Sequence, residues 1–177
     1  MSVFLTSLSL CLDNQRIVIA IDQNVRDVQT HFGSATMTIT EGAPVHGNPA
    51  HLLPPSWAST ITTWLAEDTP SFDYGGFVVG ETPAEARLLA KSPGILAGVP
   101  FIDEIFKQLG CDVKWSVKEG EEVGLGGGKQ QVAKVKGPVR KLLLGERVAL
   151  NVLARCSGVA TKSVLHNDEQ AAPKDRQ

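Results

Sequence analysis

The chain has 177 residues, of which 42% are hydrophobic and 20% are charged, and its formal net charge is -2 at pH 7. This composition suffices for one sizeable core and excludes a strongly basic nucleic-acid-binding protein or a long acidic tail. Cys11, Cys111 and Cys156 are far apart and odd in number, so free thiols in a reducing compartment are expected.

Targeting signals are also missing from the pattern. The longest apolar stretches fall well short of the ~20 residues of a spanning helix. The opening MSVFLTSLSLCL has neither a basic n-region nor a small-residue cleavage site, so it does not read as a signal peptide. We therefore expect a cytoplasmic protein.

The first 50 residues differ in character from the rest. QRIVIAID at 15–22 fits a short buried strand, whereas residues 40–55 are rich in proline, glycine and histidine and predict an extended segment. We expect an irregular N-terminal extension over 1–50 and a domain over 51–163. The polar stretch from 164 to 177 is predicted to be a disordered tail.

Two amphipathic helices are predicted in the first half of that domain. Ser56 suits an N-cap, and the residues Trp57, Ile61, Trp64 and Leu65 then recur with helical spacing until residues 68–76 break the helix. The second helix is marked by Ile102, Ile105, Phe106 and Leu109, and Gly110 ends it.

Strands surround the second helix. Residues 85–100 predict a strand pair, or one strand bent around Pro93 and Gly94. Residues 112–118 alternate strictly, with Val113, Trp115 and Val117 on one face, as in a half-buried strand. Residues 129–139 are predicted to pair with it as its antiparallel partner across a glycine-rich turn.

A long helix follows from Arg140 to about Leu165, with an expected interruption at Gly158. One-sided strands interleaved with a few helices indicate an α+β fold. We predict a small, mostly antiparallel sheet with helices packed on one face.

Several candidate sites have ordinary structural explanations. The run GLGGGKQ lacks the spacing of a phosphate-binding loop and the Ser or Thr after the lysine, so it predicts a hairpin turn. Glu67 and Asp68 end a helix, where a solvated face is the usual explanation. The four histidines, with no nucleophile motif nearby, are predicted to lie on the surface: His31, His46, His51 and His166.

The stripe formed by Arg147, Asn151 and Arg155 is the exception. These residues are four apart on an otherwise apolar helix and share one face. A buried, unpaired guanidinium costs several kcal/mol or more, so Arg147 needs a carboxylate partner, a wet cavity or an anionic ligand. Two interpretations remain open: an anion-binding face, or a solvent-facing stripe paired with Glu146 or a nearby aspartate.

Two long stretches resemble a known family. KSPGILAGVPFIDEIFKQLGCDVKWSVKEG and VAKVKGPVRKLLLGERVALNVLARCSGVAT, in this order, closely resemble the N-terminal part of the quinolinate phosphoribosyltransferase family. HLLPPSWASTITTWLAEDTPSFDYGGFVVG resembles the first helix and following turn of its eukaryotic, fungal form. The resemblance runs from about His51 to Ser163.

The resemblance implies a specific activity. Members of this family are phosphoribosyl (pentosyl) transferases that join quinolinate to phosphoribosyl pyrophosphate with decarboxylation. They yield nicotinate mononucleotide for NAD biosynthesis, and Mg²⁺ accompanies the pyrophosphate. The family fold is an N-terminal α+β sandwich followed by an incomplete C-terminal α/β barrel. Homodimer-based oligomers place one subunit's N-terminal domain over the other's barrel.

One residue of this chain matches a family substrate contact. The arginine of GERVALN, here Arg147, is implied to bind a quinolinate carboxylate in the partner's site. Asn151 and Arg155 are not carried over. The family's catalytic and metal-binding motifs belong to the barrel, and none is found in this sequence. We therefore expect the chain to be truncated, and inactive by itself.

Two alternatives to an incomplete enzyme remain. The chain could be a non-catalytic module that pairs with full-length subunits and regulates them. It could also be a relative of nicotinate phosphoribosyltransferase, although that enzyme should lack the GERVALN context. No nucleic-acid or membrane partner is expected.

Overall fold

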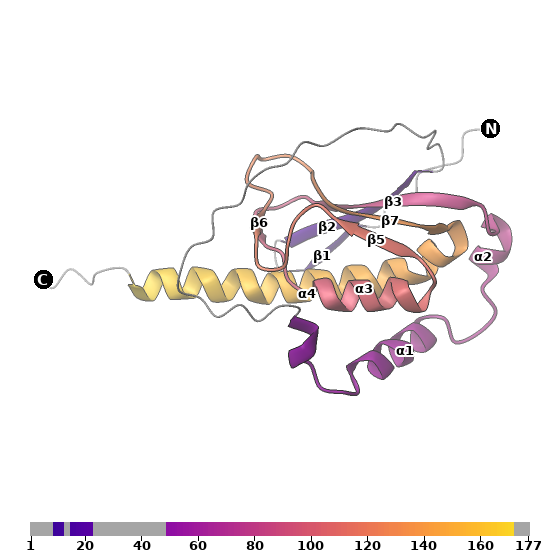
Figure 1. Ribbon diagram of the computed structural model, residues 1–177. Coiled ribbons are helices and arrows are strands. Elements are labelled where there is room, and N and C mark those ends of the chain that lie inside the picture. Colours follow the sequence, from indigo (N-terminus) through magenta and orange to yellow (C-terminus); the bar gives the residue numbers. More distant parts are fainter. Residues whose placement is uncertain (1–8, 13–14, 23–48, 172–177) are drawn as a thin grey trace, which may run out of the picture.

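The computed structural model describes residues 9–12, 15–22 and 49–171, which form one α+β arrangement (Figure 1). Its elements in chain order are β1 (Ser9–Leu12), β2 (Gln15–Asp22), a 3-10 turn (Pro49–Leu52), α1 (Trp57–Asp68), α2 (Tyr74–Val79), β3 (Pro83–Ala90), β4 (Gly94–Ile95), α3 (Val99–Gln108), β5 (Asp112–Trp115), β6 (Glu122–Val123), β7 (Gln130–Pro138) and α4 (Val139–Ala171).

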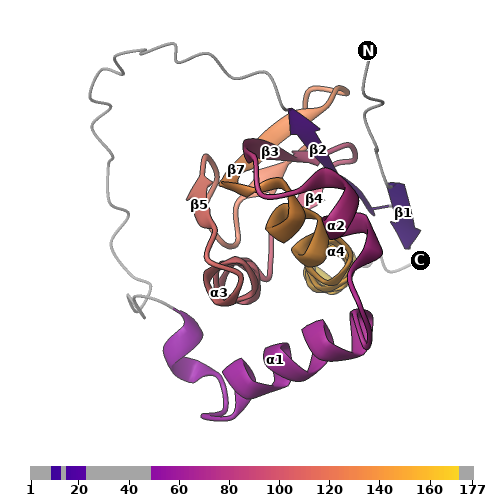
Figure 2. The same ribbon diagram turned by 90° about the vertical axis from the view of Figure 1, so that its right-hand side faces the viewer.

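The main sheet has five strands in the order β1-β2-β3-β7-β5, and every neighbouring pair is antiparallel. In both views α3 and α4 lie against one face of this sheet, and α1 lies farther out on the same side (Figures 1 and 2). The predicted fold class is thereby confirmed. The described residues form no closed barrel.

The core lies between the sheet and the α3–α4 layer. Each of these elements contributes large side chains that are fully buried, because its apolar residues recur with the period of that element. These side chains are Leu88 of β3, Ile102, Ile105 and Phe106 of α3, Val132 and Val135 of β7, and Leu142, Leu150 and Leu153 of α4.

The alternating strand is confirmed. β5 pairs with β7 from Asp112–Lys136 to Trp115–Ala133. Every second residue of 112–118, beginning with Asp112, is exposed, as the pattern predicts. The strand predicted at 15–22 is β2. It joins β3 from Ile17–Ala90 to Asp22–Glu85, so part of the segment predicted to be an irregular extension belongs to the sheet.

The prediction of a strand pair over 85–100 is only half right. Both β3 and β4 form, but β3 pairs with β2 and β7, whereas β4 pairs with β6 in a separate two-stranded sheet. The bend at Pro93 carries the chain from one sheet to the other. β4 and the residues after it then contact α4, because Ser157 Oγ accepts a hydrogen bond from the Ala97 amide (3.0 Å) and Thr161 Oγ1 from the Ile95 amide (2.9 Å).

The interruption predicted at Gly158 is wrong. α4 runs unbroken from Val139 to Ala171. One glycine lowers helix stability by only about 1 kcal/mol, which the packing on either side offsets. The same helix also extends past Ser163 through the first residues of the predicted tail, and residues 172–177 lie outside the described part.

Residues 68–76 end α1 as predicted, but they also contain the start of α2. Asp73 is the N-cap of this short helix, and its Oδ1 accepts from the Gly76 amide at 2.8 Å. Arg140, at the start of α4, forms ion pairs with Asp73 at 4.0 Å and with Glu81, which follows α2, at 2.5 Å. α2 is thus attached to the first turn of α4.

Candidate functional site

The polar stripe of α4 exists as predicted. Arg147 and Arg155 are exposed and Asn151 is half-buried, while Ala149, Leu150 and Leu153 on the other side of the helix are buried in the core. The stripe is therefore the side of α4 that faces away from the sheet. The two arginines reach solvent instead of being buried without a partner.

α1 packs alongside this stripe and is attached to α3. Ile61 is its one buried residue, and Trp57 makes an edge-to-face contact with Phe101, with ring centroids 5.8 Å apart. Gln108 of α3 donates to the Ala58 carbonyl at 2.9 Å. Ser56 takes the N-cap position, although its side chain makes no capping hydrogen bond to the described residues.

The last residue of α1 meets the first residue of the stripe. Asp68 Oδ1 lies 2.9 Å from Arg147 Nε. The aspartate side chain is 19% exposed, and that of the arginine is 61% exposed. Of the partners considered for Arg147, a carboxylate is therefore present. Asp68 is not the freely solvated residue that its place at a helix end predicted.

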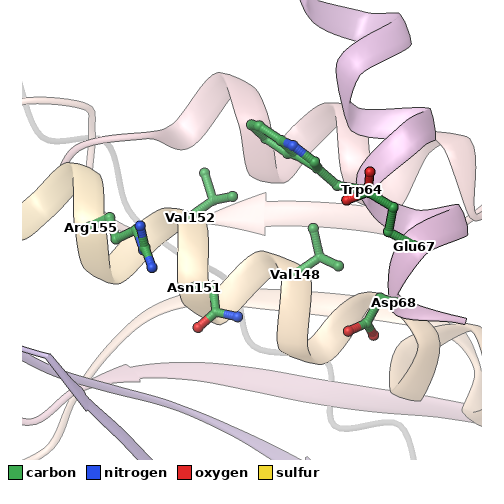
Figure 3. Close-up of a pocket in the computed structure, with 7 residues that line it drawn as sticks. All are labelled: Trp64, Glu67, Asp68, Val148, Asn151, Val152 and Arg155. Atoms are coloured by element: carbon green, nitrogen blue, oxygen red, sulfur yellow. The ribbon is translucent and has the colours of Figure 1, made fainter.

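Between the two helices lies an open groove of about 470 Å³. Figure 3 shows its lining: three residues of α1 face four residues of α4, namely Trp64, Glu67 and Asp68 with Val148, Asn151, Val152 and Arg155. Carboxylates line this groove as well as Arg155, so it is not uniformly cationic. The structure places Asn151 and Arg155 in this groove and Arg147 in contact with its Asp68 wall.

The sequence predicts a nearby aspartate as one possible partner of Arg147, and the structure shows that it is Asp68. The sequence does not identify this residue, because Asp68 is expected on a solvated helix end. A signal was nevertheless present, because a carboxylate in the last turn of a helix is disfavoured by the helix dipole unless a cation offsets it. α1 has no basic residue in its last turn, so a cation from another element would stabilise this helix end.

The glycine-rich run is a connection between strands. It links β6 to β7, with strands on both sides, and its ends are joined by the Gly124 amide, which donates to Gln130 Oε1 at 2.7 Å. The prediction of a hairpin turn is wrong, because β6 pairs with β4 and β7 pairs with β3 and β5 in a different sheet. His51 and His166 are exposed as predicted, whereas His31 and His46 lie outside the described residues.

The described residues do not fit a metal site. Within residues 9–12, 15–22 and 49–171, no three His, Cys, Asp or Glu side chains gather in a group that could hold an ion. These residues therefore contain no site in which three such protein side chains could hold the Mg²⁺ implied by the resemblance. Likewise, no helix in the described part is long and apolar enough to span a bilayer.

The cysteines of the domain are free thiols, as predicted. Cys111 is buried and Cys156 half-buried. Burial raises the pKa of both thiols, and the nearby Glu119 carboxylate raises that of Cys156 further. Because the thiolate is the nucleophile, neither cysteine is suited to attack a substrate near neutral pH. The side chain of Cys11 lies outside the described residues.

Comparison with known proteins identifies the class to which this α+β domain with its surface arginine belongs, the N-terminal domains of phosphoribosyltransferases. The model of the family described as "Quinolinate phosphoribosyl transferase, N-terminal domain" matches residues 61–157. The chain therefore belongs to this family.

Named relatives agree. The chain is 52% identical over 113 residues to the human protein "Nicotinate-nucleotide pyrophosphorylase [carboxylating]", with 63% of this chain and 37% of the relative covered. The rat protein of the same name is 53% identical over 111 residues, covering 62% and 36%. This chain thus spans about a third of the length of these curated relatives.

Solved structures share the fold. A crystal structure of a NadC deletion mutant superposes with a TM-score of 0.61 at 30% identity, covering 70% of this chain and 45% of that one. NadC from Streptococcus pyogenes gives a TM-score of 0.59 at 28% identity, covering 68% and 42%.

Proposed function

We propose that this chain acts in NAD biosynthesis as the N-terminal domain of a quinolinate phosphoribosyltransferase, and that Arg147 is its substrate-binding residue. The enzyme transfers phosphoribosyl from phosphoribosyl pyrophosphate to quinolinate and releases carbon dioxide. The observation that carries this proposal is the solvent exposure of Arg147. Its side chain is 61% exposed on the outer side of α4, in a chain that belongs to this family.

The chemistry of the substrate supports this role. Quinolinate carries two carboxylates, and the planar guanidinium of arginine binds a carboxylate through two parallel hydrogen bonds. Arg147 projects outward from the domain, so its ligand would be held by a neighbouring surface. We propose that this surface is the barrel of a second subunit in a homodimer-based oligomer.

We propose that Mg²⁺ binding and the catalytic steps of the reaction use residues outside the described part of the chain. The described residues bring together no metal ligands, so the Mg²⁺ that accompanies the pyrophosphate would be held elsewhere. We expect the 177-residue polypeptide alone to release no carbon dioxide from labelled quinolinate in the presence of phosphoribosyl pyrophosphate and Mg²⁺. Release above a buffer blank would contradict this assignment. The proposed location is the cytoplasm.

The test of Arg147 needs a complete enzyme, which a chimera supplies. Residues 51–163 of this chain would replace the matching segment of the human relative, which is 52% identical. Arg147→Ala then removes a charge-assisted contact worth about 1.5–3 kcal/mol. Because about 1.4 kcal/mol corresponds to a factor of ten, kcat/KM for quinolinate should fall at least about tenfold. Unchanged kinetics would reduce Arg147 to a structural residue.

Mixed oligomers test the cross-subunit role. The Arg147→Ala chimera is combined with a chimera whose barrel is inactivated in the lysine-aspartate-asparagine-histidine motif of the family. Hybrids that pair an intact barrel with an intact Arg147 across the interface should regain activity. If the arginine acted within its own subunit, neither hybrid site would be complete. Absence of rescue after confirmed subunit exchange would refute the arrangement.

A further inference from the structure

We propose that Asp68 is the positioning residue of the site: it holds Arg147 by its Nε so that the opposite edge of the guanidinium is presented to the substrate carboxylate. This inference rests on the proposed function for the identity of the ligand. Its structural half, the orientation of Arg147 by Asp68, stands on the geometry of this chain alone.

The first step concerns the guanidinium nitrogen of Arg147 that lies nearest to Asp68. The guanidinium has two edges that can grip a carboxylate, one formed by Nε with an Nη and one formed by the two Nη nitrogens. Asp68 Oδ1 forms an ion pair with Nε at 2.9 Å, so this carboxylate lies on the Nε side of the guanidinium. The edge formed by Nη1 and Nη2 belongs to a side chain that is 61% exposed. In the proposed arrangement, this edge receives the second carboxylate.

The second step is the fixed position of the carboxylate. The Asp68 side chain is only 19% exposed, and Figure 3 shows it at the end of α1 that meets α4. α1 is itself attached to α3 through Ile61 and through the Gln108 bond to Ala58. Asp68 is therefore a rigid anchor rather than a mobile surface group, and it removes freedom from the long arginine side chain.

The third step concerns whether Asp68 favours or opposes the binding of the substrate carboxylate. A carboxylate in the last turn of a helix opposes the helix dipole, so its place is unfavourable for α1 alone and is offset by the cation of α4. The same carboxylate also lowers the positive potential that a substrate carboxylate meets, so the proposal requires the ordering of Arg147 to outweigh this repulsion. A preorganised arginine avoids the entropy loss that a free one would suffer on binding.

The expected effect follows from this entropy. Ordering one flexible side chain at an interface corresponds to roughly a three- to tenfold change in affinity. In the chimera described above, Asp68→Ala should raise the KM for quinolinate by roughly that factor. kcat and the KM for phosphoribosyl pyrophosphate should change little. Asp68→Asn keeps an acceptor oxygen at the same length, so it should recover part of the loss.

A matched control separates positioning from folding. Glu104 of α3 is also a partly buried carboxylate, 12% exposed, and is paired with Lys107 at 2.9 Å. It also accepts a hydrogen bond from Gln108, which attaches α1 to α3. Glu104→Ala leaves the Gln108 bond to Ala58 in place and does not touch Arg147, so it should leave the KM for quinolinate unchanged. An equal rise in KM in both variants would overturn the positioning role.

The two proposals fail in different ways. In the double variant Asp68→Ala/Arg147→Ala, the aspartate change should add nothing to the arginine change, because coupled residues are not additive. If Arg147→Ala alters KM but Asp68→Ala does not, positioning is refuted and the proposed function stands. If Arg147→Ala has no effect, the proposed function itself fails.

The structural half can be measured on the 177-residue chain itself. In ¹⁵N-labelled protein, the Nε chemical shift of Arg147 should report the ion pair with Asp68. It should move in Asp68→Ala and keep its value in Glu104→Ala. An Nε shift that is the same in the unchanged protein and in Asp68→Ala would contradict the anchoring and leave the substrate assignment untouched.

Discussion

Replacing Gly145 with alanine should destabilise the domain, although alanine is the better helix former. Gly145 is a buried residue of α4. A Cβ at this position would lie 2.8 Å from Phe106 Cε1 of α3 and 2.8 Å from Cδ1 of Leu109, the C-cap residue of that helix. Leu109 is partly exposed and can give way, but Phe106 is 1% exposed and its ring is enclosed by the core. The close approach of α3 and α4 therefore depends on this glycine.

The magnitude is the difference between two effects. Alanine gains about 1 kcal/mol in intrinsic helix propensity. Inserting a carbon into a packed core costs about 1–3 kcal/mol, and contacts with two side chains below 3.0 Å favour the upper half of that range. The free energy of unfolding should therefore fall by about 1–2 kcal/mol. For a chain of this size, Tm should fall by roughly 2–8 °C.

Gly158→Ala is the matched control in the same helix. A Cβ at Gly158 meets nothing within 4 Å, so only the propensity gain remains. Gly158 lies between Ser157 and Thr161, which both bond to the segment after β3, and it is thus in the packed part of α4. Stability should rise by up to about 1 kcal/mol.

Urea unfolding followed by circular dichroism measures both variants of α4. Opposite signs at Gly145 and Gly158 are expected. Shifts in the same direction would refute the steric argument for Gly145. A loss of stability in Gly158→Ala would show that α4 is not the continuous helix described here.

The elements that could be predicted are those with a long, one-sided apolar pattern. β5 alternates because one of its faces meets the core, and α3 places Ile102, Ile105 and Phe106 on one face. The order of α1, α3 and α4 was predicted for the same reason. These patterns are local and strong, so the sequence alone is enough to find them.

The elements that could not be predicted depend on few residues or on distant partners. β4 and β6 have two residues each, too few for any period. They are held by backbone bonds such as that from the Leu96 amide to the Glu121 carbonyl, 2.9 Å. α2 contains two adjacent glycines, which disfavour a helix, and its signals are its two ends. Asp73 is the N-cap, and Gly80, with φ of 72°, follows the last turn.

The same distinction between local patterns and distant contacts applies to the candidate site. The spacing of Arg147, Asn151 and Arg155 on one helix face is a local fact and was predicted. The pairing of Arg147 with Asp68 joins two helices that are distant in the sequence, and it requires α1 to be placed by its contacts with α3. No pattern in either helix alone specifies that contact, so it had to come from the structure.

Two further predictions concern side chains that are shielded from solvent: the thiols of Cys111 and Cys156, and the hydroxyl of Ser157. Because burial raises the pKa of the Cys111 and Cys156 thiols, both should be alkylated by iodoacetamide more slowly than a free thiol at pH 8 and faster as the pH rises. Rates equal to those of a free thiol, read by mass spectrometry, would contradict this. The last prediction concerns Ser157, which is buried and whose hydroxyl accepts from the Ala97 amide at 3.0 Å and donates to the Ala97 carbonyl at 3.2 Å. Ser157→Ala removes the partner of both backbone groups, and because an unsatisfied buried polar group costs about 1–3 kcal/mol, the free energy of unfolding should fall by that amount. Ser163→Ala is the control, since its exposed hydroxyl bonds only to the Val159 carbonyl of its own helix and its loss should change stability by less than about 0.5 kcal/mol. Equal losses in the two variants would show that the contact between α4 and the segment after β4 does not contribute to stability.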